Sequence, residues 1–473
     1  MRHSSRTVEH PGYEEVVRQL DLCDDLTKDT FPEQHIRVLY FDHLVDTVKV
    51  NKEIKELINR LSKNDLAKLF EKDEYEQVHH ARDAVKAVMN GFVVIFTEKF
   101  VYKYDAYGPK TREISQSETE AVITGSHEAF VESSETNLSL VRRRLRTPSL
   151  KVKKLEVGDL TKSAVFILYL QDIANEKIVE QLKDRIASLR LDAIEDGHML
   201  VQCIDEHPHS IFPQYFTTER PDVIVSKLVD GKICGIVDHS PTAFSTPTNF
   251  FEFFASPDDN NQRWIISTFI LWMRYIALFI TLTFTAFYVS FTTYHYEMLP
   301  QALLMSIAES RDKVPFPPLV EAILLEGTIE LLREAGVRLP SKIAQTIGIV
   351  GGIVIGQAAV EAGLVSNTLI ISVAISAIAS FVIPNYILSA SLRIGRFLFI
   401  LLAGLFGNFG LVVGLILMII HLGSLSNMGA PYVNPIAPLH PRDSLRILLR
   451  IPYAWNHKRP SQSSSPQPDK RSN

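Results

Sequence analysis

The sequence predicts a multidomain protein, in which a cytosolic N-terminal region of two small α/β subdomains precedes a polytopic α-helical membrane domain. Three observations support this fold class. The chain has 473 residues, which is too long for a single compact domain. Residues 1–262 carry charges throughout and contain no apolar run of spanning length. Residues 263–425 hold several long apolar runs, which are typical of membrane helices.

The charge balance and the N-terminus exclude some classes of protein. A net charge of −5 argues against non-specific nucleic-acid binding, so we expect no nucleic acid as a partner. The N-terminus, MRHSSRTVEHPGYEEVVRQL, lacks the apolar core of a secretory signal peptide. We therefore place the N-terminal region in the cytosol, where reduced thiols are expected for Cys23, Cys203 and Cys234.

The first α/β subdomain is expected over residues 35–151, after a flexible tail at 1–34. The pattern predicts strands at 36–45, 92–96 and 99–104, and helices at 51–62 and 76–90. Thr97-Glu98 is expected to turn the chain between two of these strands. A further helix over 133–150 has a basic face and ends at Pro148. That face either meets solvent or contacts lipid phosphates or an acidic partner.

The second α/β subdomain is expected over residues 152–262. Strands are predicted at 164–170 and 232–238, and helices at 174–189 and 217–231. The region lacks a dinucleotide-binding glycine motif, a Walker loop and a nucleophile elbow, so we expect neither a cofactor nor an enzyme. One cluster contains metal-ligand residue types, namely His198, Cys203, His207 and His209. Its spacing matches no standard zinc pattern, and no metal site is predicted.

The membrane domain is expected over residues 263–425. Its apolar segments lie near 275–292, 316–334, 345–363, 365–383 and 397–421. Arg274 either snorkels to the cytosolic interface just before the first span or serves as a buried functional arginine. Residues 426–473 form a basic, Pro/Ser-rich tail that we expect to be disordered and cytosolic. Since five crossings would put this tail outside, we expect that 316–334 does not fully cross.

An acidic stripe marks the segment 316–334. On a helical wheel one face carries Glu326, Glu330 and Glu334 together with Arg333, opposite a face of leucines. These carboxylates cannot all face lipid. Either the helix lies at the membrane interface, or it crosses with its acidic face toward water or a partner. Beside a channel the stripe would raise the local cation concentration.

The segment 345–363 separates small residues from polar ones. The small stripe allows close helix packing and consists of Gly348, Gly352, Gly356, Ala359 and Gly363. The opposite face consists of Val350, Val354, Gln357 and Glu361. A helix with neighbours behind it and a polar face in front is suited to line a pore. The alternative is a tightly packed bundle helix with Glu361 at a solvated end.

The chain resembles the A-subunit family of nutrient germinant receptors, the GerA family of endospore-forming bacteria, over roughly residues 35–455. The motifs that carry the resemblance are ETNL (135–138), FPQ (212–214), TERPD (218–222), SPDD (256–259), RW (263–264), VPFPP (314–318), EGTIELLREAGVRLP (326–340) and IGIVGGIVIGQAAVEAGLVS (347–366). The last two motifs are long enough to be specific on their own.

The resemblance implies a function and a set of partners. It implies a subunit of the spore inner membrane that works with a transporter-like B subunit and a lipoprotein C subunit. It further implies an oligomer of A subunits in the lipid bilayer that forms a germinant-gated channel for monovalent cations. From the residues alone, two alternatives stay open. One is a secondary transporter with Glu326, Glu330 or Glu361 as ion-coupling carboxylates, and the other is a membrane-tethered signalling scaffold.

Overall fold

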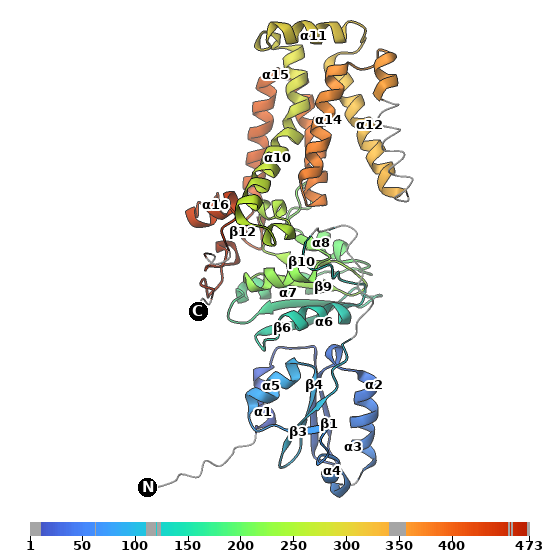
Figure 1. The fold of residues 1–473 in the computed structure, drawn as a ribbon, viewed down its shortest axis with the longest axis vertical. Helices are drawn as coiled ribbons and strands as arrows, with labels where there is room; N and C mark the ends of the chain where they lie inside the picture. Colours follow the sequence, from blue (N-terminus) through green and yellow to red (C-terminus); the bar gives the residue numbers. More distant parts are fainter. Residues whose placement is uncertain are drawn as a thin grey trace.

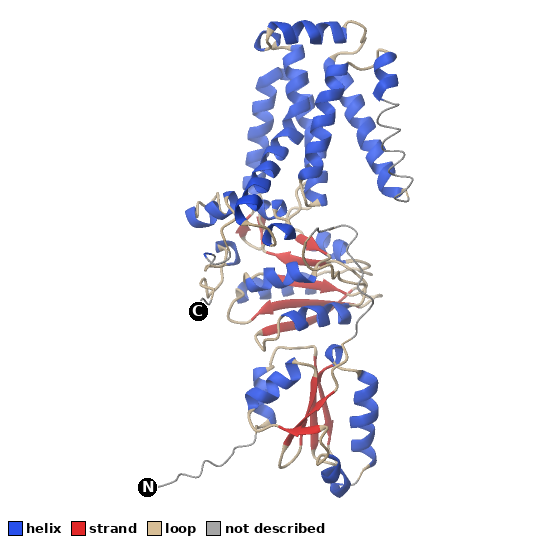
Figure 2. Ribbon diagram, viewed as in Figure 1, coloured by secondary structure: helices blue, strands red, loops and turns tan. Residues whose placement is uncertain are grey.

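The computed structural model describes residues 11–470 except 62, 110–119, 121–123, 340–355, 453–454 and 456. Three parts follow one another along the long axis of the molecule: a first α/β unit, a second α/β unit and a region of long helices (Figure 1). Figure 2 shows one sheet in each α/β unit and no sheet among the long helices of the described chain. The C-terminal segment returns to the second unit (Figure 1).

The first unit is built on an antiparallel sheet of order β1-β2-β4-β5-β3. Its strands are β1 (Leu26–Phe31), β2 (Ile36–Phe41), β3 (Tyr75–Gln77), β4 (Phe92–Phe96) and β5 (Val101–Asp105). Its helices are α1 (Tyr13–Gln19), α2 (Thr47–Val50), α3 (Glu56–Arg60), α4 (Lys63–Leu69) and α5 (Ala81–Met89), with short turns at Asp42–Leu44 and Asn51–Lys55. Successive strand residues face opposite sides, so Val38 and Leu39 enter two different cores.

The expectation of a flexible tail at 1–34 is wrong for the described residues from 13 onward. Helix α1 buries Val16 against the sheet, and β1 pairs with β2 along its whole length. The strand β1 was not predicted because it is an edge strand whose solvent face carries polar side chains, a pattern that is also typical of a loop.

The second unit has an antiparallel sheet of order β6-β7-β9-β10-β8. Its strands are β6 (Leu150–Val157), β7 (Ser163–Leu170), β8 (Phe216–Thr218), β9 (Ile233–Val237) and β10 (Ala243–Thr246). Its helices are α6 (Ser134–Arg144), α7 (Glu176–Ala187), α8 (Gly197–Ile204) and α9 (Pro221–Val229), and the short helices η3 (Phe250–Phe254) and η4 (Pro257–Asn260) lead to the long helices.

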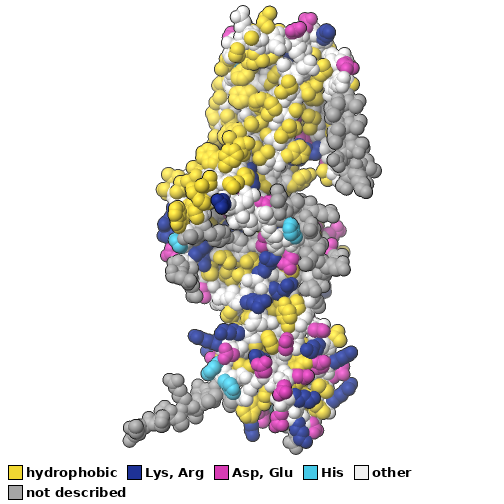
Figure 3. Space-filling view, viewed as in Figure 1, with side chains coloured by type: hydrophobic (Ala, Val, Ile, Leu, Met, Phe, Trp, Pro, Cys, Tyr) yellow, Lys and Arg dark blue, Asp and Glu magenta, His cyan; other side chains and the backbone are white. Residues whose placement is uncertain are grey.

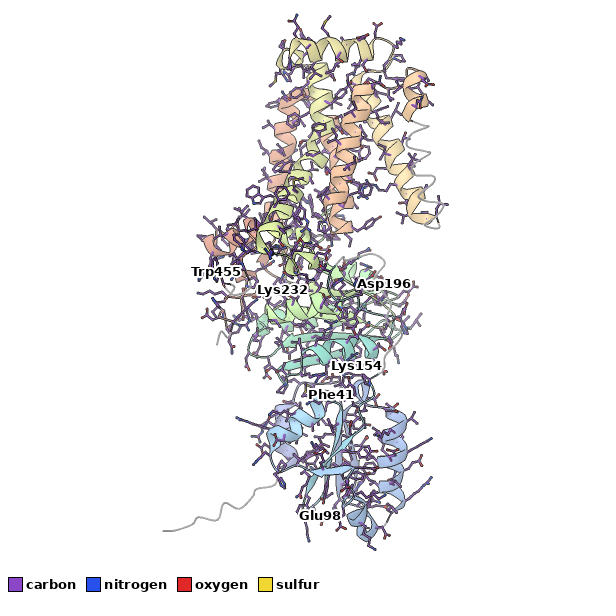
Figure 4. All side chains as sticks on the ribbon, viewed as in Figure 1. Phe41, Glu98, Lys154, Asp196, Lys232 and Trp455 are labelled. Carbon is purple, nitrogen blue, oxygen red and sulfur yellow. The ribbon has the colours of Figure 1, made fainter. Side chains whose placement is uncertain are left out.

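Arg142 joins the two α/β units. The helix expected over 133–150 ends at Arg144, and Arg142 on its basic side is fully buried instead of solvated. Its guanidinium donates to both carboxylate oxygens of Asp25, at 2.6 and 2.8 Å, and lies over the ring of Phe41. Figure 4 shows Phe41 at the end of the first unit that faces the second. A bidentate, stacked arginine of this kind fixes the two units together.

The helical region contains α10 (Trp264–Thr293), α11 (Gln301–Arg311), α12 (Pro318–Arg338), α14 (Asn367–Val382) and α15 (Tyr386–Ser424), with a short helix η5 (Tyr296–Met298) and a helical turn at 356–361. Helix α11 lies across the end of the region that is farthest from the α/β units (Figure 1). Helix α10 begins at Trp264, well before the residue at which the first span was expected.

Helix α15 is a hairpin of two arms that reverses at Gly407. The backbone of Gly407 is non-helical, with φ 62° and ψ −142°. A Cβ on Gly410 would lie 2.0 Å from the carbonyl oxygen of Leu402, a distance that eight residues of straight helix could never give. The segment expected at 397–421 is therefore not one straight span. The sequence reads as one run because apolar residues continue through the turn.

Both ends of the helical region lie on the side of the α/β units. Ser391, near the start of the hairpin, donates a hydrogen bond to the Ile211 carbonyl. His421, near its end, contacts Ser210 at 3.0 Å. The two arms of α15 therefore begin and end beside the second unit, a reversal that the single span expected at 397–421 did not include.

Two helices among the described residues, α10 and α15, are long and apolar enough to cross a membrane, and α14 is apolar but shorter. Apolar side chains cover the outside of the helical region, whereas charged side chains cover the first α/β unit (Figure 3). This distribution is the one expected of helices that face lipid above a water-exposed domain.

The C-terminal segment packs on the second unit, so the expectation of a disordered tail is wrong for its described residues. It contains β11 (Ser426–Asn427), β12 (Ala430–Pro431), α16 (Pro441–Leu448) and η7 (Ser461–Ser463). Asn427 accepts a hydrogen bond from Thr246 at 2.6 Å, and Gln462 accepts one from Asn249 at 2.7 Å. Composition alone could not reveal this, because single polar side chains hold the segment in place.

Candidate functional site

Four of the expected pore and packing residues, Gly348, Val350, Gly352 and Val354, lie outside the described residues. Gln357 and Glu361 are both exposed on the helical turn 356–361. The Gln357 amide donates to the Glu361 carboxylate at 2.9 Å, as residues four apart on a helix can do. These two side chains therefore form a polar, solvent-accessible pair in the single chain.

The described members of the small stripe have three different surroundings. A Cβ on Gly356 would meet no atom within 4 Å, while Ala359 packs against the core of the helical region. Gly363 adopts φ +67°, and a Cβ there would lie 2.9 Å from the carbonyl oxygen of Lys313. Gly363 thus ends the helical turn and allows a close approach to the chain after α11.

The acidic stripe of α12 divides between the protein interior and the surface. Glu326 and Glu330 face α15, where Arg393 and Arg396 lie. Glu334 is 60% exposed and pairs with Arg338 on the same helix. Glu326 and Glu330 thus face a neighbouring helix of the same chain.

Glu326 and Arg396 form an enclosed ion pair between α12 and α15. Their side chains are 0% and 1% exposed, and their charged atoms lie 2.8 Å apart. Thr285 of α10 donates to the Glu326 carboxylate at 2.8 Å, and Arg396 reaches the Ser376 hydroxyl of α14 at 3.3 Å. Four helices meet at this pair. Burial of two charges in an apolar region requires partners of this kind, because an unpaired charge there costs several kcal/mol.

Glu330 extends the ion pair into a network. Its carboxylate lies 3.0 Å from Arg396 and 3.2 Å from Arg393, so two arginines share it. Arg393 also reaches Ser389 at 3.0 Å. Arg333, one turn further along α12, lies over the ring of Phe381 and reaches the Ser380 hydroxyl at 3.0 Å. We call Glu326, Glu330, Arg333, Arg393 and Arg396 the interhelical charge network.

The sequence interpretation missed Arg393 and Arg396 as members of a site. Both precede the apolar segment expected at 397–421, whereas in the structure they lie inside α15 and are buried. A signal was present in their spacing, since residues three apart on a helix share one face. Two arginines on one face and an acidic stripe on another helix predict an interhelical pair.

A second cluster lies at the far end of the helices. Glu321 of α12 is fully buried, accepts a hydrogen bond from the backbone of Ser366 and lies 3.3 Å from Arg311 of α11. Tyr288 of α10 reaches the Ser366 hydroxyl at 2.9 Å. This cluster fixes the chain just after Gly363 to three helices.

A third cluster, which we call the junction, lies where α10 leaves the second unit. Asp259 of η4 is almost completely buried and accepts hydrogen bonds from Arg274 at 2.6 Å and from Arg450 at 3.0 Å. Arg274 also donates to the Phe254 carbonyl at 2.9 Å. The expectation that Arg274 snorkels at the interface is wrong, because a buried carboxylate from the α/β side holds it. Arg450 belongs to the C-terminal segment, so the junction joins three parts of the chain.

A cavity of about 1200 Å³ opens beside the junction and contains a buried lysine in its wall. Lys232 is 1% exposed and binds the Pro247 carbonyl and the Glu252 carboxylate, which Lys227 also contacts at 2.8 Å. Burial, opposed by Glu252, lowers the pKa of Lys232 to about 8. Burial raises the pKa of Glu252, but Lys227 and Lys232 outweigh it and hold that pKa below its usual value. Figure 4 shows Lys232 in the second unit, below the long helices.

Comparison with known proteins decides the family. A family model described as Bacillus/Clostridium GerA spore germination protein matches residues 14–462. The chain belongs to the GerA family. Spore germination protein GerQA of Bacillus cereus is 40% identical over 438 residues, which cover 91% of this chain and 88% of that protein. Spore germination protein A1 of Bacillus subtilis strain 168 is 36% identical over 436 residues, which cover 91% and 90%.

Among solved structures, the chain aligns with the N-terminal domain of the A subunit of the Bacillus megaterium spore germinant receptor GerK3. The TM-score is 0.36 at 23% identity, and the alignment covers 50% of this chain and 92% of that one.

Membership of the GerA family confirms the resemblance that the sequence motifs indicated. Two of those motifs coincide with the charge clusters. EGTIELLREAGVRLP contributes Glu326, Glu330 and Arg333 to the interhelical charge network, and SPDD contributes Asp259 to the junction. In this GerA-family chain, these motif residues therefore also form ion pairs with the long helices.

Proposed function

We propose that this chain is the A subunit of a nutrient germinant receptor in the inner membrane of the spore. Copies of it assemble into a channel that releases monovalent cations when nutrient is present. Family membership over residues 14–462 carries the proposal. The transporter-like B subunit and the lipoprotein C subunit are its partners, and the N-terminal α/β units lie in the cytosol.

The arrangement of the helices supports a multi-pass membrane domain. The start of α10 and the end of α15 both contact the second α/β unit, through Arg274 and His421. An even number of crossings then keeps the α/β units and the C-terminal segment on one side. The basic composition of that segment agrees with a cytosolic position.

The exposed pair Gln357 and Glu361 supports a channel lined by residues 345–363. Glu326 and Glu330 each meet an arginine, whereas Glu361 accepts its hydrogen bond from a neutral amide and is exposed. In an oligomer, this face of several copies surrounds a water-filled path, and Val350 and Val354 form its apolar constriction. Nutrient bound to the B subunit shifts the population toward the open arrangement.

Replacement of Val354 tests the channel. We expect Val354→Ala to widen the constriction, so that spores release potassium and germinate without nutrient. Potassium efflux and loss of refractility, at equal amounts of the protein, measure this. The matched control is Val360→Ala, since Val360 packs against the helical core and its replacement leaves the constriction intact. Dormant spores with normal potassium in the Val354→Ala strain contradict the proposed pore face.

An ion-coupled transporter is the alternative that the buried carboxylates would favour. Glu326 and Glu330 are engaged by arginines, which leaves them poorly suited to bind and release ions. Flux through the reconstituted receptor separates the two functions. Saturable flux coupled to a substrate favours the transporter, nutrient-gated cation current favours the channel, and a complete lack of flux favours a scaffold.

A further inference from the structure

Helix α16 presents apolar side chains that nothing in the described chain covers. Leu445 and Leu448 are 48% and 43% exposed, and residues at this spacing share one face of a helix. Ile436 and Leu439, just before the helix, are exposed as well. Arg442 is exposed on the flank of the same helix. An amphipathic helix with an arginine beside its apolar face is typical of segments that lie in a membrane surface.

The opposite side of α16 is firmly attached, so the outward direction of its apolar face is fixed. Asp443 accepts a hydrogen bond from the backbone of Ser461 at 2.8 Å, and Ser444 donates to the Pro435 carbonyl at 3.0 Å. Tyr275 of α10 donates to the Ile447 carbonyl at 3.0 Å. The helix therefore cannot roll to bury Leu445 and Leu448 without breaking these bonds.

The apolar face of α16 continues the lipid-facing surface of α10. Ile265, Phe269, Trp272 and Ile276 are exposed along the first half of α10, against which α16 packs. Figure 3 shows the apolar side chains of the helical region extending without a break onto the projection formed by α16. Trp455, which follows α16 in the chain and is labelled below it in Figure 4, is also exposed. Tryptophans are enriched where a membrane meets water.

We propose that α16 and the chain at 436–440 form an interfacial foot that lies in the headgroup region of the membrane on the side of the α/β units. Lipid is the occupant because the face is continuous with the surface of α10 and is flanked by arginine. The inference rests on the membrane position of α10 in the proposed function. Since Arg450 follows α16 and binds Asp259, the foot ties the membrane surface to the junction.

Spin labelling of the full-length protein in the intact receptor tests the foot. Cys203 is exposed and is replaced by serine, whereas Cys23 and Cys234 are buried and stay unlabelled. Single cysteines are then introduced as Leu445→Cys, as Ile276→Cys for the membrane reference and as Leu160→Cys for the aqueous reference. All three positions are exposed, so the label does not disturb the core. Collision with oxygen and with a water-soluble nickel chelate is measured in vesicles that contain anionic lipid.

We expect the ratio of oxygen to nickel collisions at position 445 to exceed that at position 160 several-fold, and the label to lie about 5–10 Å below the headgroup level. A ratio at 445 equal to that at 160, with position 276 in lipid, overturns the foot and leaves the membrane domain intact. Shielding of 445 from both reagents also overturns it, because a protein partner then covers the helix. An aqueous signal at 276 overturns the foot together with the membrane position of α10.

Discussion

At the scale of single residues, charged side chains are buried where helices meet, although their burial carries a desolvation penalty. Glu326 and Arg396 lose almost all contact with solvent, and they do so between helices with apolar outer surfaces. The attraction of the pair offsets the lost hydration only while both members are present. Such a pair specifies which helices meet and in what register, so each member should be far more sensitive to replacement than an exposed carboxylate on the same helix.

Arg396→Met is expected to destabilise the protein by about 3–5 kcal/mol, since it leaves the buried Glu326 carboxylate without its arginine. Glu326→Gln should cost less, because Arg396 keeps the Glu330 carboxylate at 3.0 Å. The double variant should lose less than the sum of the two, because it leaves neither charge behind. Thermal unfolding of the purified protein in detergent measures this. Glu334→Gln is the matched control and should cost less than about 1 kcal/mol, as its pair with Arg338 is exposed. Additive losses in the double variant would contradict the ion pair.

Lys232 makes stability depend on pH in the alkaline range. Its pKa is about 8 in the fold against 10.5 when exposed, so between these values the unfolded chain holds more protons than the folded one. The free energy of unfolding contributed by Lys232 therefore rises as pH increases from 8 to 10.5, and below pH 8 it is constant. We expect the melting temperature of the natural protein to rise relative to that of Lys232→Met from pH 8 to pH 10. A difference that stays flat over this range would contradict the burial of an ammonium group.

At the scale of elements, two glycines end or reverse helices. Gly407 turns α15 back on itself, and Gly363 ends the helical turn after the proposed pore segment. In both, the backbone has a positive φ that other residues adopt only at a cost. Around Gly363 the sequence pattern predicts a packing stripe, because glycines three or four apart can serve either purpose. Only the fold distinguishes a glycine that packs from a glycine that turns.

Gly363→Ala is expected to destabilise the protein by about 1–3 kcal/mol, because it strains the backbone and brings Cβ against the Lys313 carbonyl. Gly336→Ala is its control, since Gly336 lies in α12 and a Cβ there meets no atom within 4 Å. That change should be neutral or stabilising by up to about 1 kcal/mol. Both values come from thermal unfolding in the same detergent. Equal effects of the two changes would argue against the turn at Gly363.

The helices and strands of this fold can be predicted from the sequence better than the contacts between them. The strand expected at 92–96 coincides with β4, and the helix expected at 365–383 nearly matches α14, because both have clear apolar patterns with turn residues at their ends. The spacing of Glu326 and Glu330 predicts that the two share one helix face, and both lie against α15. Asn427 and Asp259 give no such signal, because their roles depend on residues far away in the chain.

At the scale of the whole molecule, the junction connects three parts of the described chain through one carboxylate. These parts are the second α/β unit, helix α10 and the C-terminal segment. Asp259 holds Arg274 of α10 and Arg450 after α16. A movement of the second unit, or of the membrane surface through α16, therefore reaches α10 through a buried, charged contact. A coupling element between two parts of a receptor has this property.

Asp259→Asn is expected to lower nutrient-triggered potassium release by about tenfold or more, as expected for a coupling of about 1.4 kcal/mol or more. The reason is that Arg274 and Arg450 lose the carboxylate that holds them together. The double variant with Val354→Ala should still leak, because a widened constriction needs no signal. Efflux from spores with matched protein levels measures both. If the double variant releases no potassium, Asp259 is needed for assembly of the protein instead of coupling.

The reversal of α15 also bears on how the proposed membrane domain enters a bilayer during synthesis. Between Phe397 and Ile420 the single polar side chain is Asn408, which lies beside the turn and meets the Ser290 hydroxyl at 2.7 Å. The two arms can enter the bilayer together as one apolar hairpin. The Asn408 amide is then the one polar side chain between Phe397 and Ile420 that must lose its hydration. Arg393 and Arg396 lie near the start of α15, on the side of the α/β units, so neither side chain has to cross the whole hydrocarbon layer.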